Sequence, residues 1–282
     1  MKNTLSYHSL DWNQLWQKAR EDKKNRFSDE EAWDKRAPGF ARRTATSVYT
    51  KKFIELLQPQ QQWTVLDVGS GPGTIAVPLA SHVTRITCID FSQNMLNILE
   101  QRKKEHNLDN ISTCKASWAD QWQEKGIPQH DVVIASRSLG VDNLLRALEK
   151  LNSFARKQVI VTDRVHHGPR DPEAYRAVSR PLSTGPDYIY TVNLLYQMGF
   201  AASVEMIRLD EKHLYASQDE VMESYLWMLP DLDDKEKKQL KKYIQSITTI
   251  DQDSKIHVHR RYTPRWAFIR WDPADNFRKG KR

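Results

Sequence analysis

Residues 65–74 read Val-Leu-Asp-Val-Gly-Ser-Gly-Pro-Gly-Thr, with glycine at the alternate positions Gly69, Gly71 and Gly73. The residues before these glycines are apolar and β-branched, as in a buried strand, and those after them have the periodicity of a helix. Glycine allows a backbone to turn tightly and to come close to a ligand. The stretch therefore predicts a strand, a ligand-binding turn and a helix in direct succession.

Beyond this stretch, short apolar runs alternate with segments of helical periodicity. The predicted strands are residues 64–68, 85–91, 111–117, 131–137, 158–163, 202–210 and 257–271. The predicted helices after the first strand are residues 74–83, 92–106, 143–155 and 190–200. Such alternation is typical of an α/β protein in which helices cover both faces of a parallel sheet. We expect the last two runs to form an antiparallel pair.

The segments outside this alternation read as helices. Residues 1–58 carry apolar stripes at helical spacing, and Ser28 followed by Glu31 predicts a capping box. A charged segment at about 211–250 has the spacing of solvated helices. We therefore expect an N-terminal helical cap or lid at 1–58 and a main domain at 59–282 with a helical insertion at about 211–250.

The composition is that of a globular protein. Of 282 residues, 39% are hydrophobic and 28% are charged. No apolar run approaches the about 20 residues of a membrane-spanning helix, and the first residues lack the layout of a signal peptide. These features predict a cytoplasmic protein. Cys88 and Cys114 stand in apolar stretches, so we expect buried thiols rather than a disulfide or a metal site.

The net charge of +7 is displaced toward the ends of the chain. Residues 1–50 carry 10 Lys and Arg against 7 Asp and Glu, and residues 251–282 carry 9 against 4, so the middle is nearly neutral. A basic end can attract phosphates, but it can also serve only to solubilise the chain. For the tail Arg278–Arg282 we favour the interpretation that it only solubilises the chain. We also expect that the protein binds no metal ion.

The glycine-rich stretch resembles the first motif of the class I S-adenosylmethionine-dependent methyltransferases, acidic-x-Gly-x-Gly-x-Gly, which begins here at Asp67. Asp90 then ends the next predicted strand, where that family has an acidic residue. Thr74 stands where a dinucleotide-binding fingerprint requires glycine, which argues against a dehydrogenase. The resemblance extends over residues 59–164. It implies a Rossmann-like, seven-stranded, mostly parallel sheet with an antiparallel last strand and an N-terminal helical extension.

The resemblance also implies S-adenosylmethionine as cofactor, held at the ends of several strands. The residues in matching positions are Asp67, Gly69, Ser70, Gly71, Gly73, Asp90, Phe91, Met95, Ser117, Trp118 and Ser136. Asp90 would accept hydrogen bonds from both ribose hydroxyls. Taken alone, each of two residues also has a purely structural explanation: Asp90 as a charge at a helix N-terminus, and Met95 as a core residue. Ser117 stands where the family usually has an acidic residue.

Three residues are candidates for catalysis on the acceptor side. His166 follows the fifth predicted strand, and a histidine side chain can accept a proton, although adjacent histidines on a loop are more often only solvated. Arg137 follows the fourth strand and could hold a carboxylate or phosphate. Tyr49 lies near the end of the predicted lid, where many small-molecule members of the family have a tyrosine.

The leading hypothesis is transfer of a methyl group, by in-line displacement, to a small and preferably anionic metabolite. Cys88 and Cys114 lie in predicted strands, and the fourth strand ends in Ala-Ser-Arg-Ser rather than the Asn/Asp-Pro-Pro-Tyr motif. Both observations argue against methylation of nucleic-acid bases. Two alternatives remain: an RNA-modifying methyltransferase that uses the basic termini, and a non-catalytic protein that binds S-adenosylmethionine.

Overall fold

The computed structural model of the chain describes residues 7–21, 30–44, 47–210 and 213–278. By its contacts the chain divides into two compact units. Unit 1 comprises Met1–Asp163, Gly185–Ile207 and Trp266–Arg282, and unit 2 comprises Arg164–Thr184 and Arg208–Arg265. Two predicted features, the cap at Ser28 and the basic tail from Lys279 onward, lie outside the described residues.

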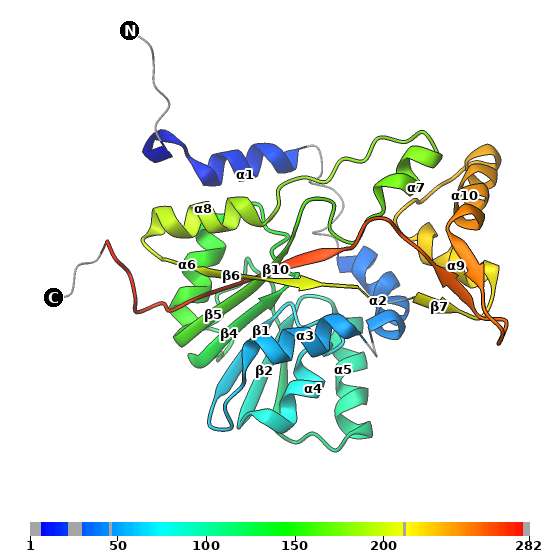
Figure 1. The fold of residues 1–282 in the computed structure, drawn as a ribbon. Coiled ribbons are helices and arrows are strands. Elements are labelled where there is room, and N and C mark those ends of the chain that lie inside the picture. The colour runs from blue at the N-terminus through cyan, green and yellow to red at the C-terminus, as the bar shows by residue number, and fades with distance from the viewer. Residues whose placement is uncertain (1–6, 22–29, 45–46, 211–212, 279–282) are drawn as a thin grey trace, which may run out of the picture. The chain divides into compact units, whose positions relative to one another are not determined.

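Unit 1 is built on a seven-stranded sheet of order β3-β2-β1-β4-β5-β10-β6. Its strands are β1 (Thr64–Val68), β2 (Arg85–Asp90), β3 (Ile111–Lys115), β4 (His130–Ser136), β5 (Ala155–Arg164), β6 (Ser203–Arg208) and β10 (Arg265–Trp271). Strands β1 to β5 pair in parallel, whereas β10 and β6 run in opposite directions (Figure 1). The expected mixed, mostly parallel sheet is confirmed.

Helices cover both faces of this sheet. They are α1 (Trp12–Arg20), α2 (Glu30–Thr44), α3 (Val48–Leu57), α4 (Ala76–Leu79), α5 (Gln93–Glu105), α6 (Leu144–Phe154) and α8 (Tyr188–Met198), with short 3₁₀ turns at Tyr7–Ser9 and Ala80–His82. Helices α3, α4 and α5 lie on one face and α6 and α8 on the other (Figure 1). Over the described ranges, the chain forms no helix with the length and hydropathy needed to cross a membrane.

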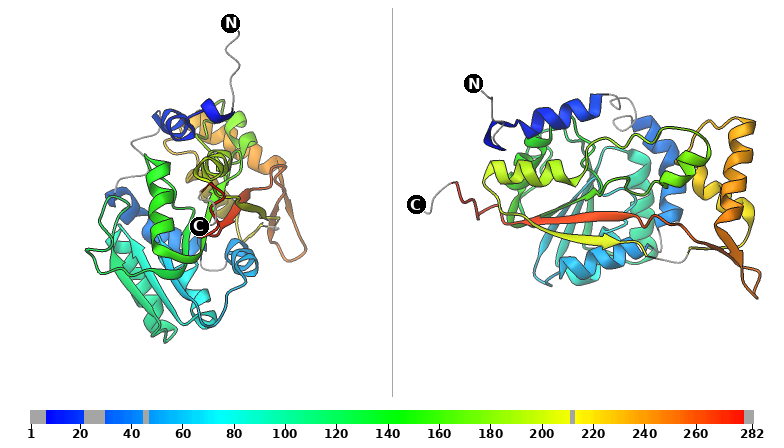
Figure 2. Two further views of the ribbon diagram at one scale, coloured as in Figure 1. Left: turned by 90° about the vertical axis from the view of Figure 1, so that its left-hand side faces the viewer. Right: turned by 45° about the horizontal axis from the view of Figure 1, so that its top comes forward.

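The N-terminal helix α1 packs against α8 and α6, as Figure 2 shows for α8. Trp16 is 2% exposed, and its indole nitrogen donates a hydrogen bond to the Val141 carbonyl oxygen at 2.8 Å. The rings of Trp12 and Trp16 both meet Tyr190 of α8 edge-on, with centroids 5.9 and 6.2 Å away. The apolar stripe of the first helix is therefore packing surface, as its spacing predicts.

The central strands are buried on both faces, which is why they read as continuous apolar runs. Val65 and Leu66 of β1 and Val133 and Ile134 of β4 are all 0% exposed. In an open α/β sheet, ligands bind at the carboxyl ends of the strands, because the loops meet there. The end of β1 and the end of β4, which pair directly, are therefore the places to look for a site.

Unit 2 has its own sheet and its own core. Its helices are α7 (Pro172–Ala177), α9 (Gln218–Leu226) and α10 (Asp234–Ser246), and its antiparallel strands, in the order β7-β9-β8, are β7 (His213–Tyr215), β9 (Ile256–Val258) and β8 (Thr248–Ile250). Apolar side chains from these helices and from β9 form one buried cluster.

Two expectations about this region are wrong. The run 257–271 is not one strand, because Val258 is buried in the core of unit 2 whereas Phe268 is buried in unit 1. The chain leaves one sheet after β9 and enters the other at β10. The segment 211–250 is also not wholly helical, since it contributes β7 and β8 as well as two helices. Strands β7 and β8 have only three residues each, so the alternation of apolar and polar residues that marks a strand is too short to be seen in the sequence.

A buried carboxylate holds part of unit 2 together. Asp171 is 1% exposed, and its Oδ2 accepts hydrogen bonds from the hydroxyls of Tyr243 at 2.8 Å and Tyr225 at 3.2 Å. The Arg260 guanidinium in turn donates to the Tyr225 hydroxyl at 3.0 Å. Because a buried carboxylate is costly unless donors surround it, these tyrosines stabilise Asp171.

Replacing Tyr243 with phenylalanine is expected to lower the free energy of unfolding by about 1.5–3 kcal/mol, the usual value of a hydrogen bond to a charged group. Denaturant unfolding measures this loss. Tyr196→Phe is the control, because that ring is 49% exposed. Equal stability of the two variants would contradict the role given to Asp171.

Candidate functional site

The turn after β1 adopts the conformation that its glycines allow. Gly69, Gly71 and Gly73 have φ of 68°, 55° and 76°, all in the left-handed region. A Cβ atom on Gly69 would lie 2.5 Å from Ser138 Cβ, and one on Gly73 would lie 2.4 Å from Leu99 Cδ1. On Gly71 the nearest atoms would be 3.9 Å away. Two glycines thus permit close packing, while a Cβ on the middle one would meet Met95 and Phe40 only at ordinary van der Waals distance.

Asp90, at the end of β2, joins this turn to the start of α5. Its Oδ2 accepts a hydrogen bond from the Gly71 amide at 2.8 Å, and its Oδ1 accepts one from the Ser92 amide at 2.9 Å. Burial raises the pKa of Asp90, while these backbone donors oppose the rise. Each carboxylate oxygen has two lone pairs, so Asp90 can still accept a hydrogen bond from a ligand.

Asp67 lies beneath the turn and is 2% exposed. Burial, and then the nearby Asp90 carboxylate, raise the pKa of Asp67 to about 7. Its Oδ2 atom is buried and has no hydrogen-bond partner among the described residues. A buried polar atom of this kind is costly unless a ligand supplies a donor, and a cationic donor suits a carboxylate best.

Helix α2 lies against the turn and against α5. Its Asp34 accepts hydrogen bonds from the Ser92 hydroxyl at 2.5 Å and from the Asn94 amide at 3.2 Å. Arg102 of α5 donates to the carbonyl oxygens of Pro72 in the turn and Ala41 in α2, at 2.8 and 2.9 Å. These bonds tie α2 to α5, and Arg102 also links α5 to the glycine-rich turn.

The remaining residues predicted to contact the cofactor follow β1, β2, β3 and β4. Ser70 and Met95 are buried, and Phe91 is partly exposed. The amide and hydroxyl of Ser117 both donate to Asp120 Oδ2, at 2.7 and 3.1 Å. The Trp118 indole donates to the Ser138 carbonyl oxygen at 3.2 Å, which brings it beside the end of β4. Asp120 therefore uses the polar groups of Ser117, a contact that the sequence analysis did not identify.

Tyr49 of α3 is buried where β4 and β5 end. It is 1% exposed, and its hydroxyl makes hydrogen bonds with Ser136 Oγ at 2.7 Å and Thr162 Oγ1 at 2.6 Å. Burial raises the pKa of Tyr49 above its ordinary value. A tyrosine with a raised pKa stays protonated, so the Tyr49 hydroxyl can donate a hydrogen bond but is a poor proton acceptor.

The Arg137 guanidinium is enclosed by aromatic rings. Its central carbon lies 4.1 Å from the ring centre of Tyr49, 5.7 Å from that of Trp266 and 5.9 Å from that of Phe40. Burial lowers the pKa of Arg137, yet an arginine stays charged in proteins. No described carboxylate forms an ion pair with it. The geometry presents a planar cation that can bind an anionic group.

His166 belongs to unit 2, whereas Arg137 and Tyr49 belong to unit 1. The His166 ring is exposed and lies 3.8 Å from that of His167, which meets Tyr262 at 5.6 Å. Burial lowers the pKa of His167. Of the three catalytic candidates, the structure brings Arg137 and Tyr49 together.

Several residues around Arg137 were missed by sequence reasoning. Phe40, Trp266 and Thr162 come from α2, β10 and β5, so no local pattern connects them with the turn. Of these three, only Thr162 could have been found from the sequence, because it stands near the end of a predicted strand, where the residues of a ligand site gather.

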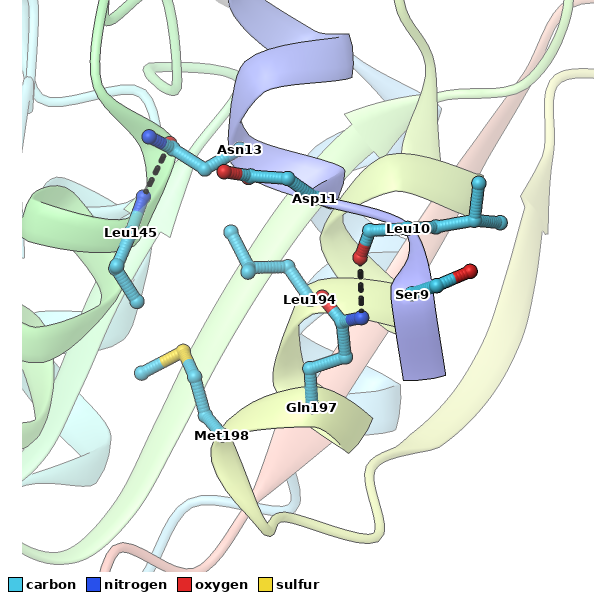
Figure 3. Close-up of a pocket in the computed structure, with 8 residues that line it drawn as sticks. All are labelled: Ser9, Leu10, Asp11, Asn13, Leu145, Leu194, Gln197 and Met198. Carbon is cyan, nitrogen blue, oxygen red and sulfur yellow. Dashed lines mark hydrogen bonds between the residues drawn. The ribbon is translucent and has the colours of Figure 1, made fainter. Parts of the chain in front are cut away.

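A separate hollow of about 370 Å³ in unit 1 lies between the N-terminal helices and α6 and α8. Figure 3 shows its lining residues Ser9, Leu10, Asp11, Asn13, Leu145, Leu194, Gln197 and Met198. Asn13 accepts a hydrogen bond from the Leu145 amide at 3.0 Å, and Gln197 donates to the Leu10 carbonyl oxygen at 2.7 Å. These side chains hold the helices together, so we interpret the hollow as a packing groove.

Comparison with known proteins agrees with this geometry. Residues 65–158 match the methyltransferase domain family. An uncharacterized protein of Haemophilus influenzae is 34% identical over 243 residues, which cover 85% of this chain and 88% of that protein. A demethylmenaquinone methyltransferase of Porphyromonas gingivalis is 38% identical over 69 residues, which cover 23% of this chain and 28% of that enzyme.

Among solved structures, a methyltransferase of Bacillus halodurans, named as putative, superposes with a TM-score of 0.53 at 10% identity. The match covers 79% of this chain and 98% of that one. It therefore supports the fold, while the sequence matches support the family. Through the domain at residues 65–158, the chain belongs to the class I S-adenosylmethionine-dependent methyltransferases, with S-adenosylmethionine as the methyl donor.

Proposed function

We propose that the protein transfers the methyl group of S-adenosylmethionine to a small anionic metabolite. The observation that carries this proposal is Arg137, a planar cation without a described carboxylate partner at the end of β4. Arginine recognises carboxylate and phosphate groups through paired hydrogen bonds. Such a cation near the methyl donor would hold the acceptor by its charge.

The residues of the turn fit the methyl donor. S-adenosylmethionine, when bound, supplies an electrophilic methyl group on a positively charged sulfur. We propose that Asp67 accepts a hydrogen bond from its ammonium group, because the buried Oδ2 has no other described donor. We propose that Asp90 accepts from the ribose hydroxyls and that the open backbone at Gly71 allows close approach. We also propose that Phe91, Met95 and the other residues predicted for this site contact the cofactor.

On the acceptor side, we propose that each candidate has a distinct role. Arg137 holds the anionic group. Tyr49 supports Arg137 through its ring and stays protonated, since burial raises its pKa. For His166, which lies in unit 2, the role of proton acceptor stays a prediction from the sequence. The main contribution of the protein is then orientation of the two reactants for in-line displacement.

One screen tests the substrate class. The protein is incubated with S-adenosylmethionine and either a small-molecule extract or total RNA, and formation of S-adenosylhomocysteine is measured. We expect turnover with the small-molecule fraction, concentrated in its anionic part after ion exchange. Turnover with RNA alone would overturn the proposal in favour of an RNA-modifying enzyme, and binding without any turnover would favour a non-catalytic protein.

Arg137→Gln is expected to lower turnover of the active fraction about 30-fold, because it removes the charged, paired hydrogen bonds to the anion. Affinity for S-adenosylhomocysteine, measured by calorimetry, should change by less than about twofold. Arg146→Gln on the exposed side of α6 is the matched control. Equal turnover by both variants would show that Arg137 does not hold the acceptor.

A further inference from the structure

Thr162, at the end of β5, is the point where the groups around Arg137 are joined. It is 0% exposed. Its Oγ1 accepts a hydrogen bond from the Arg137 amide at 3.0 Å and lies 2.6 Å from the Tyr49 hydroxyl. Its carbonyl oxygen accepts from the same Arg137 amide at 3.2 Å. One buried residue thus contacts the backbone of Arg137 and the ring on which its guanidinium is stacked.

Arg137 needs such support because its backbone is in an uncommon conformation. Its φ is 57°, in the left-handed region that residues other than glycine rarely adopt. A conformation of this kind persists only when surrounding contacts hold it. The two acceptors on Thr162 hold the amide of Arg137, and the turn that follows β4 then directs the side chain toward Tyr49.

The Arg137 amide favours one direction for the hydroxyl protons, because Thr162 Oγ1 already accepts from that amide and is then the better donor to Tyr49. Thr162 Oγ1 lies 2.6 Å from the Tyr49 oxygen but 3.5 Å from Ser136 Oγ, and Tyr49 lies 2.7 Å from Ser136. If Thr162 donates to Tyr49 and Tyr49 donates to Ser136, both protons are used in short bonds. This arrangement leaves the Ser136 hydroxyl proton for an acceptor outside the three hydroxyls, beside the cation of Arg137.

We propose that Thr162 is a positioning residue of the methyl-transfer site: its buried hydroxyl holds Arg137 in the left-handed conformation and directs the Tyr49 and Ser136 hydroxyls, so that Arg137 and Ser136 together present donors to an anion. The proposal rests on the function proposed for Arg137. It extends that function by making anion recognition depend on a threonine that does not itself touch the anion.

The test uses the full chain and a reagent that reports on a single guanidinium. Phenylglyoxal modifies arginine, and peptide mass spectrometry follows the rate at Arg137 alone. Thr162→Val keeps the shape and removes the hydroxyl, while Thr162→Ser keeps the hydroxyl. Thr87→Val is the matched control, because Thr87 is also buried in the sheet and its hydroxyl is bonded to His130 Nε2 at 2.8 Å. Calorimetry with S-adenosylhomocysteine checks that each variant is folded.

We expect Arg137 of Thr162→Val to react about threefold faster or more, because the guanidinium is no longer held on the Tyr49 ring, and Thr162→Ser to restore the original rate. Thr87→Val should react as the unaltered protein does. An unchanged rate in Thr162→Val, or an equal increase in Thr87→Val, would overturn the proposal. If Thr162→Val does not fold, Tyr49→Phe is decisive, because it keeps the ring but removes the hydroxyl that bonds to Thr162 and Ser136. An unchanged rate there would also overturn the proposal.

The same assay separates this proposal from the proposed function. Benzoate and inorganic phosphate, as probes of carboxylate and phosphate binding, should slow modification of Arg137 in the unaltered protein. Thr162→Val should need about fivefold more of the effective anion for equal protection. If neither anion protects Arg137, the anionic substrate is rejected, and the comparison of rates still decides whether Thr162 positions the arginine.

Discussion

Replacing Gly69 with alanine is expected to weaken binding of S-adenosylhomocysteine about 100-fold or more and to lower the free energy of unfolding by about 2–4 kcal/mol. The new methyl group would lie 2.5 Å from Ser138 Cβ, far inside van der Waals contact. Ser138 cannot simply turn away, because its hydroxyl is bonded to the Val68 carbonyl oxygen at 2.7 Å. The ends of β1 and β4 must therefore separate. Calorimetry and denaturant unfolding measure the two effects.

Two other glycines separate the causes of this effect. Gly126 also has a positive φ, 74°, and a Cβ there would meet nothing within 4 Å, so Gly126→Ala measures backbone strain alone. It should cost about 1 kcal/mol and leave ligand affinity unchanged. Gly71→Ala should be nearly as stable as Gly126→Ala, because its Cβ would meet only ordinary contacts, yet bind the ligand poorly if the cofactor approaches the Gly71 backbone as proposed. Normal binding by Gly69→Ala would show that the turn does not contact the cofactor.

Asp67→Asn is expected to remove a pH-dependent loss of stability of about 4 kcal/mol. The pKa of Asp67 is raised from 3.8 in a model peptide to about 7 in the folded protein. The folded state therefore holds a proton that the unfolded state has released between these values. Stability consequently falls as the pH rises from about 4 to about 7, and it is level above that range. Asparagine has no such proton to lose.

Urea unfolding at about pH 4.5 and pH 7.5 measures how much the free energy of unfolding changes with pH. This change is compared between the unaltered protein and the variant. Asp131→Asn is the control, because the pKa of Asp131 is lowered to about 2 despite its burial, mainly by hydrogen bonds from Thr64. Asp131 therefore contributes stability that is lost only below about pH 4, outside the measured window. The same pH dependence in Asp67→Asn and the unaltered protein would contradict the raised pKa.

Because the pKa of Asp67 is raised to about 7, we also expect a proton to be released on ligand binding. An ammonium group at Oδ2 would favour the charged carboxylate and lower its pKa, so binding near pH 6.5 should release a fraction of a proton. Calorimetry in buffers of different ionisation enthalpy detects this release, and Asp67→Asn should abolish it. Uptake of a proton instead would show that the ligand does not bring a cation to Asp67.

The glycine-rich turn and its neighbour Asp90 could be predicted from the sequence because both follow from local patterns. The turn from Gly69 to Gly73 follows directly on a strand, and Asp90 is at the end of the neighbouring strand, whose pairing with β1 follows from the alternation of strands and helices. In a parallel sheet, such strand ends meet at one edge. Their residue types then indicate which groups face a ligand.

The surroundings of Arg137 could not be predicted in the same way. Phe40, Tyr49 and Trp266 are each unremarkable where they stand in the sequence, and only tertiary packing brings them to one guanidinium. The core of unit 2 is a similar case. A run such as 257–271 has strand character throughout, and its pattern does not show which of two sheets each half joins.

The place of β10 in the sheet has a consequence for how the protein is made. Although β10 is the last strand in sequence, it lies between β5 and β6. During synthesis, β6 leaves the ribosome without a neighbour to pair with until residues 265–271 follow. Trp266 reaches the Arg137 guanidinium in the same step. A nascent chain can thus form the glycine-rich turn and the first five strands early, while the aromatic surroundings of Arg137 are completed only with the final strand.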